Sequence, residues 1–188
     1  MSPLFTAFFL MFMVFMAAQR IWETFFRKMG KSGTIFKKWT FSVLSTLHVT
    51  IGIGTIVEYF VMQRTINLGV TLLGLIMFFS AFFFRTWVIN ILGEYHSIHI
   101  EIREDHPLMR EGPYRYIRHP YYLSVIFELL GFPLIANAYY SFLCSLFVYL
   151  PFLLIRVHFE ERAMTEKFGD AYLKYKSETW RFLPIKRK

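Results

Sequence analysis

The fold of this chain is decided by residues 121–155, which read YYLSVIFELLGFPLIANAYYSFLCSLFVYLPFLLI. This stretch divides into two apolar runs, residues 121–136 and 138–155, and only Asn137 and its neighbours separate them. A separation this short predicts a tight helical hairpin. Each run is a little shorter than the roughly 20 residues that a helix needs to cross a bilayer. Pro133 and Pro151 are expected to kink or end the two arms.

Three longer apolar runs precede the hairpin, at residues 4–26, 41–62 and 68–91. Apolar residues make up 55% of the 188 residues, and 23 of them are Phe. A soluble domain of this size cannot hide so much apolar surface, whereas lipid serves as its solvent. The first run has no basic residue before it and no small-residue cleavage site, so we interpret it as a retained span. The sequence predicts an all-α integral membrane protein with about five transmembrane helices.

The remaining composition excludes several classes of site. Cys144 is the single cysteine and lies inside an apolar run, which excludes a disulfide framework and a Cys-rich metal site. The histidines include no pair at metal-ligand spacing on a helix with an acid, so we expect no metal. The net charge of +8 lies beside apolar spans. Its expected partner is therefore the anionic membrane surface and not nucleic acid.

The distribution of basic residues predicts the orientation. Residues 27–38 hold five Lys or Arg, residues 85–120 hold five and residues 156–188 hold nine, whereas the loop near Arg64 holds one and the hairpin tip none. Basic loops stay on the cytoplasmic side. Five crossings put all three basic regions on that side, with the N-terminus outside. We expect two parts, with three transmembrane helices in residues 1–91 and a catalytic region in residues 92–188.

A polar cluster precedes the hairpin at residues 111–122, which read EGPYRYIRHPYY. Pro120 is well placed in the first turn of a helix, where its missing N–H is not needed. Arg118 and His119 then lie at the mouth of the bundle. One interpretation is a basic interfacial anchor with an aromatic belt, and the other is the wall of a pocket.

A second polar cluster, residues 156–162, follows the hairpin. Arg156 and Glu160 are four residues apart and share a helix face, which the hairpin returns to the side of His119. They form either an exposed ion pair of little energetic value or a functional pair at the membrane boundary. Glu128, inside the hairpin, is unfavourable in lipid and is either a partner for an arginine or part of a cavity.

The order and spacing of several motifs together resemble the isoprenylcysteine carboxyl methyltransferase family. The resemblance covers residues 92 to about 180, and the short chain is similar to prokaryotic-type members, which favours a bacterial-type plasma membrane. The motifs are Leu92-Gly93, His106-Pro-Leu-Met109, Gly112-Pro-Tyr114, Arg118-His-Pro-x-Tyr122, Arg156-x3-Glu160-Glu161 and Phe168-Gly-x2-Tyr172-x2-Tyr175.

This resemblance implies transfer of a methyl group from S-adenosylmethionine to a lipid-like or prenylated acceptor, in a pocket at the cytoplasmic membrane face. Arg156 would face the acceptor and form a catalytic pair with Glu160. Ser124 stands where many members carry Gly. The resemblance therefore constrains the identity of the acceptor less than the identity of the cofactor. Matching positions imply cofactor contacts from His106, Pro107, Leu108, Met109, Tyr114, His119, Pro120, Tyr121, Tyr122 and Glu160, with His99 added by position only.

The chemistry of these side chains agrees with that role. Glu160 accepts hydrogen bonds from a ribose or an amino group, and Tyr114 and Tyr122 stack on adenine or lie against a sulfonium. A carboxylate acceptor, such as that of an isoprenylcysteine, needs no base, and Arg156 would hold it as a two-pronged clamp. A hydroxyl acceptor needs a base, for which His119 or Glu161 is the first candidate.

Three alternatives remain open. The nearest is a phospholipid or other small-lipid methyltransferase. The second is an NADPH oxidoreductase resembling sterol reductases, and the third is a non-enzymatic membrane adaptor whose charged clusters are interfacial anchors.

Overall fold

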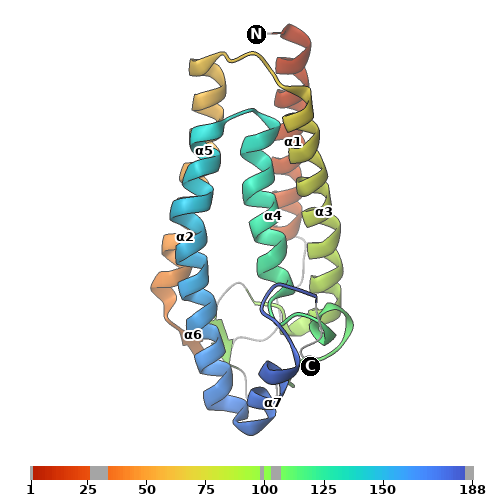
Figure 1. The fold of residues 1–188 in the computed structure, drawn as a ribbon, viewed down its shortest axis with the longest axis vertical. Coiled ribbons are helices and arrows are strands. Elements are labelled where there is room, and N and C mark those ends of the chain that lie inside the picture. The colour runs from red at the N-terminus through yellow and green to blue at the C-terminus, as the bar shows by residue number, and fades with distance from the viewer. Residues whose placement is uncertain (1, 26–33, 98–99, 103–106, 185–188) are drawn as a thin grey trace.

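The computed structural model describes residues 2–25, 34–97, 100–102 and 107–184, and its helices form an elongated bundle (Figure 1). Its short elements are strands β1 (Thr34–Phe36) and β2 (Ile100–Ile102), 3-10 turns Gly93–Tyr95 and Gly112–Arg115, and the π-helical segment Ser145–Tyr149. Its α-helices are α1 (Pro3–Phe25), α2 (Lys38–Met62), α3 (Leu68–Leu92), α4 (Pro120–Ile135), α5 (Tyr139–Cys144), α6 (Leu150–Phe168) and α7 (Asp170–Glu178).

The helices of the bundle run alternately in opposite directions, and α5, the π-helical segment and α6 form one continuous rod (Figure 1). Within the described residues, four helices have the length and apolar composition of membrane spans: Pro3–Glu23, Lys38–Met62, Leu68–Leu92 and Tyr139–Phe168. Helix α4 has 16 residues, which gives about 24 Å of rise against a hydrocarbon core of about 30 Å. The prediction of an all-α integral membrane protein is confirmed, whereas five crossings and an external N-terminus stay predictions.

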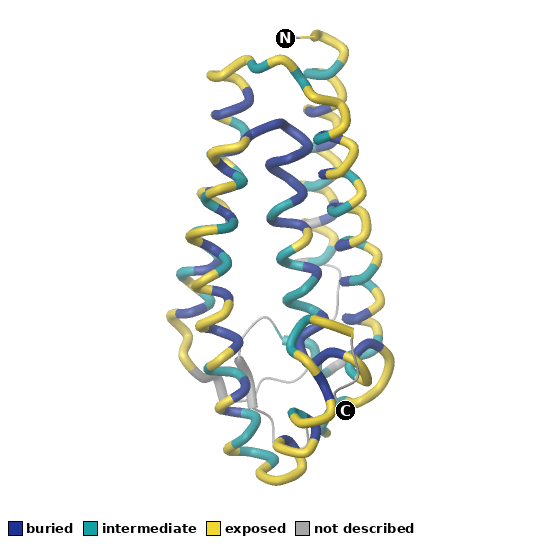
Figure 2. The backbone as a smooth tube through the Cα atoms, viewed as in Figure 1, coloured by how far each residue is buried: buried dark blue, intermediate teal, exposed yellow. Residues whose placement is uncertain are grey.

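Helix α4 lies among the other helices, and nine of its 16 residues are buried. Residues 131–138 are all buried (Figure 2). Its backbone approaches α3 closely, since a Cβ atom added at Gly74 would lie 2.6 Å from the backbone nitrogen of Ile135 and 2.7 Å from the carbonyl oxygen of Gly131. Small residues allow such close helix contacts in membranes.

The predicted hairpin is confirmed, and Asn137 makes its turn. Asn137 has a φ of 55°, a left-handed conformation that asparagine tolerates better than most residues. Its side-chain oxygen accepts a hydrogen bond from the backbone nitrogen of Asn67 at 2.9 Å, and its amide nitrogen donates to the Thr71 hydroxyl at 2.8 Å. The turn is thereby fastened to the beginning of α3. Pro133 lies in the last turn of α4, and Pro151 lies in the first turn of α6.

An ion pair inside the bundle decides between the two interpretations of Glu128. Arg85, on α3, is 1% exposed and donates to Glu128 on α4 and, at 3.2 Å, to Glu23 on α1. Glu128 is therefore the partner of an arginine and helps to join three helices.

Residues 100–102 form β2, which pairs antiparallel with β1. This pairing brings the segment that follows α3 beside the beginning of α2. Both strands lie at the end of the bundle that carries the polar clusters (Figure 1).

Candidate active site

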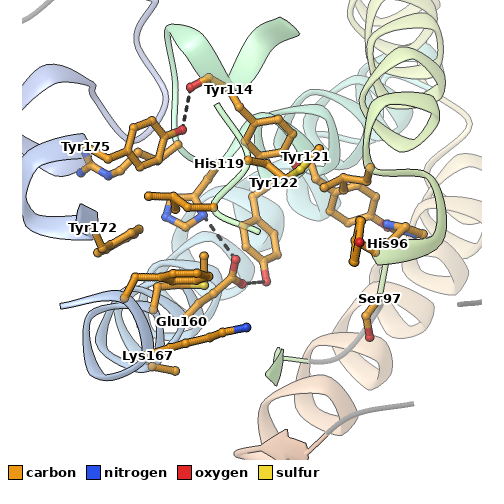
Figure 3. A pocket seen from close by; sticks show the side chains of 18 residues that line it. His96, Ser97, Tyr114, His119, Tyr121, Tyr122, Glu160, Lys167, Tyr172 and Tyr175 are labelled. Carbon is orange, nitrogen blue, oxygen red and sulfur yellow. Dashed lines mark hydrogen bonds and ion pairs between the residues drawn. The ribbon is translucent and has the colours of Figure 1, made fainter. Parts of the chain in front are cut away.

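A pocket lies at the polar end of the bundle, where the beginning of α4, the turn Gly112–Arg115, α6 and α7 meet (Figure 3). It holds about 990 Å³ of empty space, part of which is open solvent. The hairpin creates this pocket, because it returns α6 to the end of the bundle at which α4 begins.

One face of α6 lines the pocket. The lining residues of this helix recur at helical spacing, which is the pattern of a single face. The helix ends at Phe168, and Gly169 has a φ of 52°, a conformation that favours glycine. The chain then turns into α7, which adds Tyr172 and Tyr175 to the wall. The lining residues of α6 are Glu160, Ala163, Met164, Lys167 and Phe168.

The beginning of α4 supplies the opposite wall. Pro120 is the first residue of the helix, as its fixed φ favours, and is itself buried outside the pocket lining. His119 precedes it and is 5% exposed. The two imidazole nitrogens lie 3.7 Å from Glu160 Oε1 and 3.4 Å from Glu161 Oε1. His119 therefore lies between two neighbouring carboxylates of α6.

A chain of hydrogen bonds leads from the pocket to a buried arginine. The Tyr122 hydroxyl donates to Glu160 Oε2 at 2.5 Å and accepts from Arg156 Nε at 2.9 Å. Arg156 is 4% exposed and also donates to the Thr40 hydroxyl on α2 at 3.1 Å. Tyr122 and Glu160 line the pocket, whereas Arg156 does not. The Tyr122 phenol thus lies between the pocket and the buried guanidinium.

Glu161 has a different role from Glu160, although the two are adjacent. Its carboxylate is 3% exposed and pairs with Arg118 at 3.1 Å, Arg181 at 2.8 Å and Lys176 at 3.6 Å. The hydrogen bond that Arg181 donates to Glu161 raises the pKa of the Arg181 guanidinium. Because successive helix residues point about 100° apart, Glu161 faces the C-terminal segment and is not among the lining residues. It holds that segment against the beginning of α4, so the structure does not favour Glu161 as a base.

Aromatic rings make up much of the remaining wall. Tyr175 donates from its hydroxyl to the backbone oxygen of Tyr114 at 2.6 Å, which fixes α7 against the turn Gly112–Arg115. Burial raises the pKa of Tyr172 and of Tyr175 well above the ordinary range, so both phenols stay neutral. The pocket therefore has a neutral aromatic lining around the Glu160 carboxylate.

The structure brings most of the predicted cofactor residues together. Pro107 is exposed and, like Pro120, lies outside the pocket lining. His99 and His106 lie outside the described residues. Sequence reasoning missed His96, Ser97 and Lys167, although the seven-residue spacing from Glu160 could have indicated Lys167. The roles of all these residues stay predictions. The predicted residues that line the pocket are Leu108, Met109, Tyr114, His119, Tyr121, Tyr122 and Glu160.

This fold defines an integral membrane protein with a pocket at one end of a helical bundle. The sequence model of the isoprenylcysteine carboxyl methyltransferase (ICMT) family matches residues 72–166, half of the chain. The chain therefore belongs to this family.

Relatives of known sequence extend the match beyond that region. An uncharacterised protein of Haemophilus influenzae is 31% identical over 140 residues, which are 74% of this chain and 81% of the relative. The uncharacterised protein YpbQ of Bacillus subtilis is 29% identical over 145 residues, 74% of this chain and 83% of the relative. The protein-S-isoprenylcysteine O-methyltransferase of Saccharomyces cerevisiae is 28% identical over 117 residues, which are 61% of this chain and 49% of the yeast enzyme.

A solved structure shares the fold. The eukaryotic intramembrane Ras methyltransferase ICMT superposes with a TM-score of 0.63 at 20% identity, over 82% of this chain and 55% of that chain. The likeness concerns the helical arrangement alone, because the sequence identity is low.

Proposed function

We propose that this chain transfers a methyl group from S-adenosylmethionine to a lipid-like acceptor, with the carboxylate of an isoprenylcysteine or a related O-nucleophile as first candidate. Family membership and the similarity to the yeast protein-S-isoprenylcysteine O-methyltransferase support methyl transfer. The observation that carries the proposal is the hydrogen-bonded chain from Glu160 through Tyr122 to Arg156. It links a pocket suited to a cofactor with a buried cation suited to an anionic acceptor.

The pocket residues fit an S-adenosyl group chemically. Aromatic faces attract a sulfonium cation, and Tyr121 and Tyr122 contribute such faces to the lining. The Glu160 carboxylate, 30% exposed at the pocket, accepts hydrogen bonds from ribose hydroxyls or an ammonium group. When bound, S-adenosylmethionine supplies an electrophilic methyl group and leaves as the neutral thioether S-adenosylhomocysteine.

Arg156 is suited to hold the acceptor. Its guanidinium presents several donors in a plane, which matches a carboxylate. The residue follows the apolar segment 153–155, so an acceptor held there keeps its lipid chain among apolar side chains. An ionised carboxylate needs no base, and alignment with the methyl group in a site sheltered from water supplies most of the catalysis.

The proposed site faces the cytoplasm of a bacterial-type plasma membrane. Of the described basic residues, Lys37, Lys38 and Arg110 belong to the pocket end, whereas Arg64 lies at the opposite end. Basic residues favour the cytoplasmic side.

Two measurements on the purified protein test the proposal. Calorimetry with S-adenosylhomocysteine is expected to detect binding, and the absence of binding would overturn the proposal. Labelled S-adenosylmethionine is then offered with farnesylcysteine, alkyl-pyrones and phospholipids. A base-labile methyl ester of farnesylcysteine is the expected product. Labelled phospholipid as the sole product would support the rival lipid methyltransferase, and a thermal shift with NADPH alone would support the oxidoreductase.

A further inference from the structure

The pocket lining carries opposite charges on one face of α6. Glu160 and Lys167 both line the pocket and are seven residues apart. Seven residues make two turns of helix, so the two side chains leave the same face about 10.5 Å apart along the axis. Figure 3 shows both side chains on the α6 side of the pocket. The Lys167 ammonium lies 4.8 Å from the centre of the neighbouring Phe168 ring, near the pocket.

Arg118 also belongs to the described lining residues, but its charge is used elsewhere. It pairs with Glu161 at 3.1 Å and donates to the backbone oxygens of Lys176 and Thr179. The residue is 7% exposed, and its guanidinium therefore holds the C-terminal segment in position. Lys167 lies on the half-buried edge of the pocket, and its flexible stem allows the ammonium to reach a ligand.

The geometry points to Lys167 as the residue that binds the amino-acid carboxylate of the S-adenosyl ligand. This inference rests on the proposed function. An S-adenosyl ligand carries ribose hydroxyls near its middle and a carboxylate at one end. A carboxylate acceptor at Glu160 and an ammonium donor at Lys167, two helical turns apart, match that order of groups. Ala163 and Met164, which also line the pocket, lie between these two side chains on the α6 face.

The two ends of the ligand are separable experimentally. S-adenosylhomocysteine and 5′-methylthioadenosine share the adenosine and the thioether sulfur, but only the first carries the amino-acid group. Dissociation constants for both are measured by calorimetry on the full chain in detergent, for the wild type, Lys167→Met and Lys167→Arg. Lys174→Met on α7 is the matched control, because it removes the same charge from an exposed position outside the pocket lining.

Lys167→Met is expected to weaken the binding of S-adenosylhomocysteine about tenfold, since hydrogen bonds between charged groups contribute that much to affinity. The affinity for 5′-methylthioadenosine is expected to stay within about twofold, which also shows that the variant is folded. Lys167→Arg keeps most of the preference for the amino-acid ligand, and Lys174→Met keeps all of it.

If Lys167→Met lowers the affinity for both ligands equally, or lowers neither, the assignment of Lys167 is overturned while the proposed function stays intact. A wild-type protein that binds neither ligand overturns the proposed function and this assignment together.

Discussion

Both ends of the helical bundle contain a carboxylate beside an arginine, but their surroundings differ. At the end opposite the pocket, Glu58 is 7% exposed and accepts hydrogen bonds from the backbone nitrogens of Tyr140 at 3.0 Å and Ser141 at 2.8 Å. It also pairs with Arg64 at 3.1 Å. At the pocket end, the Glu160 side chain is 30% exposed and contacts His119 and Tyr122.

This difference indicates two uses for charge in a membrane protein. An ionisable group inside a bundle is unfavourable unless its partners satisfy it. Glu58 has backbone partners at the beginning of α5, so it fastens the hairpin to α2. Glu160 keeps acceptor surface toward a pocket. Substitutions at the opposite end should therefore change stability, and those at the pocket end should change binding or turnover.

The largest effect is expected from Glu58→Ala. It leaves two backbone N–H groups without their acceptor and removes the carboxylate that pairs with Arg64, and breaking a buried charged network destabilises a protein by about 3–5 kcal/mol. Arg64 is 26% exposed and regains some solvation, so we expect about 3 kcal/mol. Denaturation in detergent measures the loss. The affinity of the folded fraction for S-adenosylhomocysteine should not change.

Ser141→Ala is the milder control for that experiment, because it removes only the hydroxyl bond to Glu58 at 3.0 Å. A Glu58→Ala protein with normal stability and weakened ligand binding would contradict the contrast between the two ends.

Arg156→Ala, in contrast to Glu58→Ala, should lower turnover and not stability. We expect turnover of a carboxylate acceptor to fall about 100-fold, as for the loss of one strong electrostatic contact to reacting atoms. Affinity for S-adenosylhomocysteine should change little, because Arg156 is outside the pocket lining. Single-turnover rates and calorimetry separate the two quantities. Arg156→Lys keeps the charge but not the planar pair of donors, so it should recover only part of the rate.

Turnover that survives Arg156→Ala would mean that the guanidinium does not hold the acceptor. The residue would then be a structural partner of Tyr122, and the pocket end would resemble the opposite end.

Glu160→Gln should weaken the binding of S-adenosylhomocysteine about tenfold, since a charged hydrogen-bond acceptor is replaced by a neutral one. Stability should be kept, because the amide oxygen still accepts from Tyr122. Glu166→Gln is the matched control on the same helix, where the carboxylate is 56% exposed and pairs with Arg162. Equal effects of both substitutions would show that net charge, and not position on the pocket face, controls affinity.

The hairpin and most of the pocket could be predicted from the sequence. The motifs around residues 112–122 and 156–160 stand immediately before and after the hairpin, so one short turn is enough to bring them together. The turn itself follows from the apolar runs and from Asn137. These features depend on local spacing, which a sequence displays directly.

Contacts between distant helices could not be predicted in the same way. The apolar residues of a span indicate that it is buried in lipid or protein, but not which helix it touches. The sequence therefore did not indicate that Arg85 pairs with Glu23. It also did not indicate that Glu58 contacts the hairpin. The adjacent Glu160 and Glu161 also look equivalent in sequence, and only the position of the C-terminal segment separates their roles.

The smallest expected effect tests a contact that the family match does not cover. Thr40 lies on α2, outside residues 72–166, and its hydroxyl accepts from Arg156 at 3.1 Å while donating to the backbone oxygen of Lys37 at 2.9 Å. Thr40→Val removes this acceptor but keeps the shape of the side chain. We expect the acceptor KM to rise about fivefold, equivalent to ~1 kcal/mol, with S-adenosylhomocysteine affinity unchanged. Thr40→Ser should restore the wild-type value. If Thr40 acts by positioning Arg156, Thr40→Val causes no further rise in the acceptor KM when Arg156→Ala is already present. A further fivefold rise in that background would mean that Thr40 influences the acceptor without Arg156, and α2 would then belong to the acceptor site in its own right.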